Sequence, residues 1–233
     1  MKTLSSAVED YLKAIFEIQG EEGQGRVSTS ALAERLGVAR ASVTGMLKKL
    51  STMDPQLVRY ERYHGAKLTP AGEKIALEVI RHHRLIECYL MEALDYSWDE
   101  VHLEADRLEH VISEEFEDRI ADMLGHPDID PHGHPIPDRD GTVREQEGIP
   151  LTQLRVGQQA YISRVSDHDP ALLRYLDQLG FTLHVKIEVI ERGPFDGPLH
   201  VRLISSDAVH ALGRQVTDHI IVSERVSERR KRP

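Results

Sequence analysis

Residues 27–50 read VSTSALAERLGVARASVTGMLKKL. Its apolar residues recur at helical spacing in two short groups, which are Leu32, Ala33 and Leu36, then Val43, Leu47 and Leu50. Gly37 separates the groups and favours a tight turn, because glycine adopts backbone angles that other residues avoid. Two short helices joined by a glycine-containing turn, with basic residues on the open side of the second, are typical of a helix-turn-helix.

The sequence after this motif predicts a hairpin and then a long helix. Residues 57–69, LVRYERYHGAKLT, alternate as a β-hairpin does, with His64-Gly65 as the expected turn. Thr69 and Pro70 suit the cap and the first position of a helix. A helix-turn-helix followed by a hairpin predicts a winged helix.

Helical patterns also cover residues 6–20, closed near Gly20, and residues 70–124. Five prolines and four glycines interrupt the pattern over 125–150, which we interpret as a linker, with its histidine-rich piece HPDIDPHGHP solvated. The β-like runs QQAYISRV, VKIEVIER and LHVRLI follow, with the helical segment ALLRYLDQLG among them. These runs predict a small β-barrel with one inserted helix.

The expected fold is therefore mainly α with a small β part. We expect an N-terminal winged helix-turn-helix, a helical domain and a C-terminal β-barrel. The corresponding boundaries are 1–73 for the winged helix, 74–140 for the helical domain, 141–150 for a linker, 151–226 for the barrel and 227–233 for a basic tail.

The net charge of −10 is unevenly distributed along the 233 residues. Residues 75–147 carry 20 acidic and six basic side chains, whereas residues 26–74 carry nine basic and four acidic ones. This contrast indicates two kinds of partner, one anionic and one cationic. Cys88 is the single cysteine, and no apolar run is long enough to span a bilayer, so we expect a cytoplasmic protein without a membrane partner.

The basic segment predicts a DNA-binding surface. The residues expected to face DNA are Ala39, Arg40, Ala41, Ser42, Thr44, Gly45, Lys48, Lys49, Arg59, Arg62 and Lys67. Arg40 is suited to a bidentate base contact, the small residues permit close approach to thymine methyls, and the others suit phosphates. The alternative is a winged helix that makes only protein contacts.

The acidic segment predicts metal binding. On one helix, Asp106, Glu109 and His110 would converge on one point, whereas His102 would lie about 12 Å from His110 along the axis. The pair His83 and Glu87, four residues apart on the preceding helix, supplies partners for His102 instead. Two complementary histidine and carboxylate groups therefore favour two cation sites. The alternative is a solvated acidic face with ordinary surface hydrogen bonds.

The chain as a whole resembles the diphtheria toxin repressor family of metal-dependent regulators, which includes manganese-transport regulators. The resemblance covers nearly the full chain. It is carried by MKTLSSAVEDYLKAIFEI, AERLGVARASVTGMLKKL, HHRLIECYL, HLEADRLEHVISEEFEDRI, GHPIP and the barrel from Leu151 to Val222. It implies a homodimer and an SH3-like, FeoA-like C-terminal domain.

The resemblance also implies ligand sets for two metal sites. The primary site would be Asp10, Asp106, Glu109 and His110, and the ancillary site would be His83, Glu87 and His102. A loop of the third domain completes the ancillary site in some family members. The matching stretch here offers Asp167, His168 or Asp169, although its spacing departs from the family's glutamate and glutamine.

A second departure bears on the metal. Iron-responsive members carry methionine and cysteine where this chain has Asp10 and Asp106. Carboxylates suit harder ions, so Mn²⁺ is favoured, with Fe²⁺ as the alternative and other divalent transition metals expected to bind in vitro.

The resulting prediction is a transcriptional regulator, and a repressor by family resemblance, rather than an enzyme. When loaded with metal, a dimer would bind a palindromic DNA operator and control genes of metal homeostasis, such as transporters. Two rivals stay open. One is a winged-helix regulator that senses a small organic ligand, and the other is a dinuclear metal hydrolase, for which the sequence offers no nucleophile or general-base motif.

Overall fold

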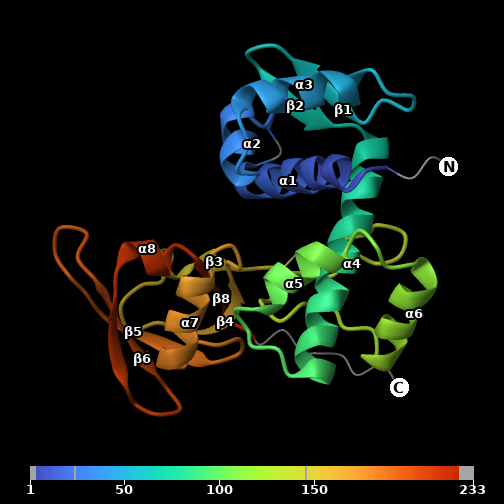
Figure 1. Ribbon diagram of the computed structural model, residues 1–233. Helices are drawn as coiled ribbons and strands as arrows, with labels where there is room; N and C mark the ends of the chain where they lie inside the picture. Colours follow the sequence, from blue (N-terminus) through green and yellow to red (C-terminus); the bar gives the residue numbers. More distant parts are fainter. Residues whose placement is uncertain (1–3, 24, 145, 226–233) are drawn as a thin grey trace. The chain divides into compact units, whose positions relative to one another are not determined.

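The computed structural model describes residues 4–23, 25–144 and 146–225 (Figure 1). The chain divides into two compact units. One unit contains the chain up to His82 together with residues 109–111 and 137–142, and the other contains residues 83–108, 112–136 and the chain from Val143 onward. The basic tail predicted at 227–233 lies outside the described residues.

The first unit contains the winged helix (Figure 1), built from α1 (Ser6–Glu22), α2 (Thr29–Arg35), α3 (Arg40–Ser51), β1 (Val58–Glu61) and β2 (Gly65–Leu68). α2 begins where the Ser28 hydroxyl accepts a hydrogen bond from the Ala31 amide at 3.0 Å, and Gly37, with φ of +63°, lies in the turn before α3. Fully buried apolar side chains fill the core, among them Leu12, Ile15, Leu32, Val43, Leu47 and Leu50. The predicted helix-turn-helix is confirmed.

The wing differs from the prediction in its turn. β1 and β2 pair antiparallel from Val58 opposite Leu68 to Glu61 opposite Gly65. The loop is therefore residues 62–64 rather than His64-Gly65. Gly65 lies in the strand instead, with φ of +88°, where a Cβ would come within 2.3 Å of the Val27 carbonyl oxygen. Glycine is thus required by close backbone approach and not by the turn itself.

The first helix is also longer than expected. α1 continues through Gly20 to Glu22. It ends at Gly23, which has a left-handed φ of +85° and donates its amide to the Gln19 carbonyl. Gly20 does not end the helix, because a glycine inside a helix lowers its stability without preventing it from continuing.

Helix α4 (Pro70–Leu94) begins as predicted. The Thr69 hydroxyl accepts a hydrogen bond from the Gly72 amide at 3.2 Å, and Pro70 stands where no helical N–H bond is lost. Although α4 is long, no helix in the described part of the chain is apolar enough to cross a membrane.

The prediction that one helix carries His102, Asp106, Glu109 and His110 is wrong. The chain forms α5 (Val101–Leu108) and, after a break, α6 (Glu114–Met123). Ser113 starts α6 by accepting the Phe116 amide at 3.2 Å, so the two helices are separate elements. Glu109 and His110 consequently follow the end of α5 and do not share a helical stripe with His102.

The histidine-rich segment interpreted as solvated linker is ordered and largely buried, which corrects that interpretation. Asp130 is 1% exposed and His132 is 0% exposed. The Asp130 carboxylate accepts the backbone amides of His132 and His134 at 2.8 and 2.9 Å, which closes a tight turn. A Cβ on Gly133 would lie 2.2 Å from the Ser163 carbonyl oxygen, so this turn packs directly on the sheet.

The second unit contains a six-stranded antiparallel sheet in the order β3-β8-β4-β5-β6-β7 (Figure 1). Its elements are β3 (Ile149–Pro150), the 3₁₀ turn η1 (Leu151–Gln153), β4 (Gln159–Val165), α7 (Pro170–Leu179), β5 (Lys186–Arg192), β6 (Leu199–Leu203), β7 (Val209–Leu212), α8 (Arg214–Thr217) and β8 (Ile220–Ser223). The predicted helix between strands is α7, whose Leu173 and Leu176 enter the sheet core. Trp98, from the loop before α5, belongs to the same core.

Candidate functional site

The densest group of metal-ligating side chains lies in the second unit, where α4 and α5 present His83, Glu87 and His102. Glu87 Oε1 lies 3.0 Å from His83 Nε2 and 3.1 Å from His102 Nδ1. The two imidazole nitrogens are themselves 3.0 Å apart. The three donor atoms therefore form a nearly equilateral triangle, and Glu87 is fully buried.

This triangle fits a divalent ion. Ligands at right angles on one ion, each about 2.1 Å from it, are about 3.0 Å from one another. In addition, Glu87 Oε2 is buried without a hydrogen-bond partner among the described residues. A buried carboxylate oxygen that is left unsatisfied is costly, so a cation would supply the missing interaction.

Asp106, predicted for the primary site, contacts the ancillary histidines. Its Oδ1 lies 3.3 Å from His83 Nδ1 and its Oδ2 lies 3.7 Å from His102 Nε2. His83, His102 and Asp106 accordingly form one of the groups able to hold a metal ion. The i, i+4 spacing of His102 and Asp106 on α5 is the physical reason, because it places both side chains on one face of that helix.

The loop between β4 and α7 in the sheet domain also contributes side chains to this group. Asp167 Oδ2 lies 3.7 Å from His102 Nδ1, while Asp167 Oδ1 lies 3.4 Å from His168 Nδ1. Asp169 has another role, since its carboxylate accepts the Ala171 amide at 2.8 Å and so caps α7. Of the three residues named from this loop, Asp167 is the buried one.

Sequence reasoning missed three nearby residues, Asp130, His132 and His134. His132 Nδ1 lies 3.7 Å from Glu87 Oε1, and Glu87, His132 and Asp167 form a further group with metal-ligand geometry. The signal available was a pair of histidines two residues apart around Gly133. The pair was not recognised as ligands because a turn and not a periodic element positions these side chains.

The pKa values of the group reflect its charge. Burial opposes ionisation of Glu87 and Asp167, yet the surrounding imidazoles, His83 for the first and His134 for the second, hold both pKa values well below the usual range. Burial likewise opposes the charged form of His132, but its contact with the Glu87 carboxylate and the other nearby carboxylates raise its pKa to about 9. The carboxylates are thus anionic at neutral pH and available to a cation.

The first unit holds the remaining predicted primary ligands, Asp10, Glu109 and His110. His110 Nε2 lies 2.8 Å from Asp10 Oδ1 and 3.4 Å from Glu109 Oε1, and the three form a group with metal-ligand geometry. Burial raises the pKa of Asp10, a change that the nearby His110 opposes and Glu109 reinforces. The sequence did not point to Glu9 or Lys13. Glu9 Oε2 lies 2.7 Å from His110 Nδ1, and Lys13 Nζ lies 2.7 Å from Glu109 Oε2.

The predicted DNA-facing residues lie on the open side of α3 and on the wing. All are exposed except Thr44, which is half-buried and donates its hydroxyl to the Arg40 carbonyl at 3.0 Å. Thr44 therefore has an internal partner in addition to any phosphate. A Cβ on Gly45 would meet nothing within 4 Å, which leaves room for a groove wall at that position.

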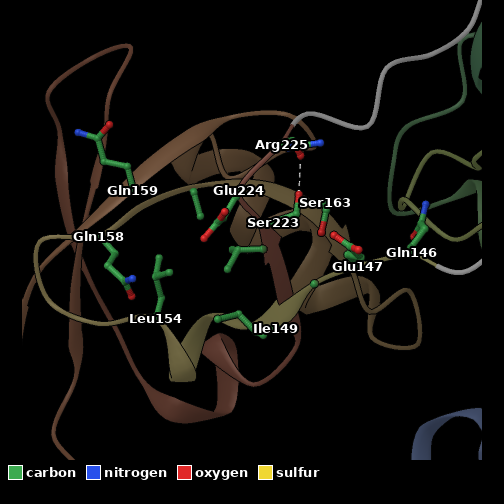
Figure 2. A pocket seen from close by; sticks show the side chains of 13 residues that line it. Gln146, Glu147, Ile149, Leu154, Gln158, Gln159, Ser163, Ser223, Glu224 and Arg225 are labelled. Carbon is green, nitrogen blue, oxygen red and sulfur yellow. Dashed lines mark hydrogen bonds between the residues drawn. The ribbon is translucent and has the colours of Figure 1, made fainter.

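A separate cavity of about 660 Å³ lies in the sheet domain, between the segment before β3 and the end of β8 (Figure 2). Ile149 and Leu154 give it an apolar side, whereas Glu147 and Glu224 are acidic. Ser223 donates its hydroxyl to the Arg225 carbonyl at 2.6 Å beside it. None of the predicted site residues lines this cavity, so it is distinct from the metal-ligating groups.

Three family models match the chain. They are the iron dependent repressor N-terminal DNA binding domain at residues 3–66, the iron dependent repressor metal binding and dimerisation domain at 69–138, and the FeoA domain at 149–224. Together they cover the winged helix, the helices that carry the ligand groups, and the sheet.

Among known proteins, the iron-dependent repressor IdeR of Mycobacterium tuberculosis is 35% identical over 137 residues, which are 59% of this chain and 58% of IdeR. The HTH-type transcriptional regulator MntR of Geobacillus kaustophilus is 37% identical over 118 residues, 51% of this chain and 80% of MntR. A solved manganese-dependent transcriptional repressor in complex with manganese is 39% identical, with a TM-score of 0.87 over 94% of this chain and 100% of that one. The match thus spans somewhat more than half the length of the iron-dependent repressors.

Proposed function

The chain belongs to the diphtheria toxin repressor family of metal-dependent regulators, and on that premise we propose that it is a transcriptional regulator that binds double-stranded DNA as a homodimer when loaded with a divalent metal ion. Its action would be repression of genes for metal homeostasis. We propose a cytoplasmic location, where such a regulator would meet DNA, and a sensory rather than an enzymatic role.

The contact that supports this proposal most directly joins Asp10 Oδ1 and His110 Nε2, which lie 2.8 Å apart. Asp10 is on α1, within the part of the chain that matches the DNA-binding domain, whereas His110 and Glu109 belong to the part that matches the metal-binding domain. Ligands from both parts converge on one point. Occupancy of that point therefore couples α1 to residues 109–110.

When bound, a divalent ion supplies the positive charge that lets the carboxylates of Asp10 and Glu109 lie close together. Without such charge the two carboxylates repel, and Lys13 and His110 offset only part of the repulsion. The position of α1 relative to residues 109–110 thus depends on metal. We include Asp106 among the primary ligands, as the family resemblance implies, in the metal-loaded state.

For the ancillary group we propose His83, Glu87, His102 and Asp167, with His132 as an additional ligand. The donor triangle around Glu87 supports the first three. Asp167 extends from the sheet domain, so metal binding here would fasten that domain to α4 and α5.

Dimer formation and the metal's effect on DNA affinity are linked in this proposal. Exposed apolar side chains on α5 and α6, including Leu103, Phe116 and Met123, suit a surface shared with a second copy. A C₂ dimer presents two recognition helices at a fixed spacing, which matches a palindromic operator. A coupling of about 1–3 kcal/mol between metal and DNA would change DNA affinity about 5- to 150-fold.

Mn²⁺ is the proposed metal, with Fe²⁺ as the alternative. Three carboxylates and one imidazole in the primary set favour these harder ions over metals that prefer sulfur. Because the intrinsic affinity order places Zn²⁺ and Cu²⁺ above Mn²⁺, metal availability in the cell must contribute to selectivity.

The test uses a DNA duplex selected from a random library in the presence of Mn²⁺. We expect fluorescence anisotropy to report tight binding with Mn²⁺, weak binding with EDTA, and recovery when Mn²⁺ is restored. Binding that is equal under all three conditions would contradict the proposal and favour a regulator that responds to an organic ligand.

A further inference from the structure

A second group of ligand atoms adjoins the ancillary group. It consists of Asp130, His134 and Asp167. Asp130 Oδ2 lies 3.3 Å from His134 Nδ1, which in turn lies 3.5 Å from Asp167 Oδ2. Two segments far apart in the sequence, the turn after α6 and the loop before α7, thus present three oxygen and nitrogen donors to one another.

Two of these ligand atoms lack hydrogen bonds among the described residues. Asp130 Oδ2 and His134 Nδ1 are both buried without a hydrogen-bond partner among the described residues, although they are close to each other. Their separation is short enough for contact, but their geometry does not align a donor with an acceptor. Burying polar atoms without hydrogen bonds is costly, and a bound cation would supply the missing interaction.

The backbone holds Asp130 in this orientation. Its other oxygen, Oδ1, accepts the amides of His132 and His134, and the Asp130 side chain is 0% exposed. The Asp130 carboxylate therefore cannot turn toward solvent without breaking two hydrogen bonds. A buried carboxylate fixed by its backbone, with one oxygen left over, is preorganised to bind a cation.

Asp167 links the two groups. The same oxygen, Oδ2, lies 3.7 Å from His102 Nδ1 in the ancillary group and 3.5 Å from His134 Nδ1. A carboxylate in this position is suited to bridge two neighbouring ions, because each of its oxygens carries two lone pairs.

Charge also favours a further cation here. Glu87, Asp106, Asp130 and Asp167 bring four carboxylates within one cluster. Arg84 Nε lies 3.5 Å from Asp130 Oδ2 and offsets part of this charge.

We propose that Asp130, His134 and Asp167 form a further divalent-cation site that shares Asp167 with the ancillary group. Two carboxylates and an imidazole suit Mn²⁺ or a similarly hard first-row ion. This inference does not require that the protein bind DNA.

The test measures the number of Mn²⁺ ions bound per chain by equilibrium dialysis over a saturating series. His134→Ala should bind one ion fewer than the unmodified chain. His126→Ala, which removes a half-exposed imidazole paired with Asp122, is the matched control and should bind the full number. Equal stoichiometry in His134→Ala and the unmodified chain would overturn the proposal.

A second measurement needs no variant. Anomalous diffraction from crystals of the unmodified chain grown with Mn²⁺ should show a peak at bonding distance from His134 Nδ1 and Asp130 Oδ2, separate from the ancillary peak. A fully occupied ancillary peak with none beside His134 would refute the site. Neither measurement involves DNA. A negative result for this cation site can therefore be distinguished from a failure of the proposed regulatory function.

Discussion

His132 Nε2 lies 2.9 Å from the carbonyl oxygen of Trp98, and the two rings are stacked with centroids 5.6 Å apart. A carbonyl oxygen only accepts, so Nε2 carries a proton and Nδ1 is the nitrogen that faces Glu87. Trp98 also packs in the core of the sheet domain and donates its indole N–H to the Pro131 carbonyl at 2.9 Å. The ancillary group and the sheet core therefore share one stacked pair of rings.

Because Trp98 is the single tryptophan, its fluorescence should report occupancy of the ancillary group. We expect Mn²⁺ to quench its emission in a saturable manner. The response should be lost in Glu87→Gln but kept in Asp10→Ala, whose altered ligand belongs to the other unit. Equal responses in the two variants would show that the quenching does not arise from the ancillary group.

Asp106→Ala should abolish metal-dependent DNA binding while leaving a folded dimer. The residue contacts His83 and His102 and is also proposed as a primary ligand, so metal affinity should fall about 10- to 100-fold. Isothermal titration with Mn²⁺, alongside anisotropy on the selected duplex, measures both effects. Asp122→Ala removes an exposed carboxylate of α6 and serves as the control. Unchanged Mn²⁺-dependent DNA affinity in Asp106→Ala would count against its assignment.

Lys13→Met tests the ion pair beside the primary group. Lys13 Nζ and Glu109 Oε2 are 2.7 Å apart, with side chains only 10% and 1% exposed. Removing the ammonium leaves a buried carboxylate without that partner, so the metal-free protein should lose about 3–5 kcal/mol in the free energy of unfolding. Mn²⁺ should restore part of this loss, and urea unfolding with Mn²⁺ or EDTA measures both values. Lys67→Met, at an exposed wing residue, should change neither. A metal-free Lys13→Met protein as stable as the unmodified chain would show that the pair has no net effect.

Arg40→Ala should reduce binding to the selected duplex by about 1–3 kcal/mol and bring it closer to the affinity for a scrambled duplex. Lys48→Ala, in contrast, should weaken binding to both duplexes alike and lower the salt dependence. Competition anisotropy at several salt concentrations separates the two patterns. If Arg40→Ala left the preference for the selected duplex intact, Arg40 would not read bases.

Local sequence signals predicted the parts of the fold that local interactions determine. The pair His83 and Glu87 follows from helical spacing on α4, and the turn at Gly37 follows from glycine's backbone freedom. The hairpin, the start of α4 at Thr69 and the helix within the sheet domain also matched the structure. In each case neighbouring residues provide the cap, the turn or the buried face.

The missed features depend on long-range contacts. The end of α5 at Leu108 accompanies burial of Glu109 against Lys13, 96 residues away in the chain. The order of the segment around Asp130 depends on the Trp98 and Ser163 backbone, against which His132 and Gly133 pack. Neither contact leaves a periodic trace in the sequence. Asp130, His132 and His134, which a long-range contact and a tight turn position, were therefore overlooked.

The most direct test of the central claim, that a metal ion joins α1 to residues 109–110, is anomalous diffraction at the manganese edge from the Mn²⁺-loaded protein bound to its selected duplex. The account predicts a peak at bonding distance from the Asp10 carboxylate, Glu109 and His110. A structure with Mn²⁺ elsewhere, but with Asp10 turned into solvent and no peak beside His110, would contradict it.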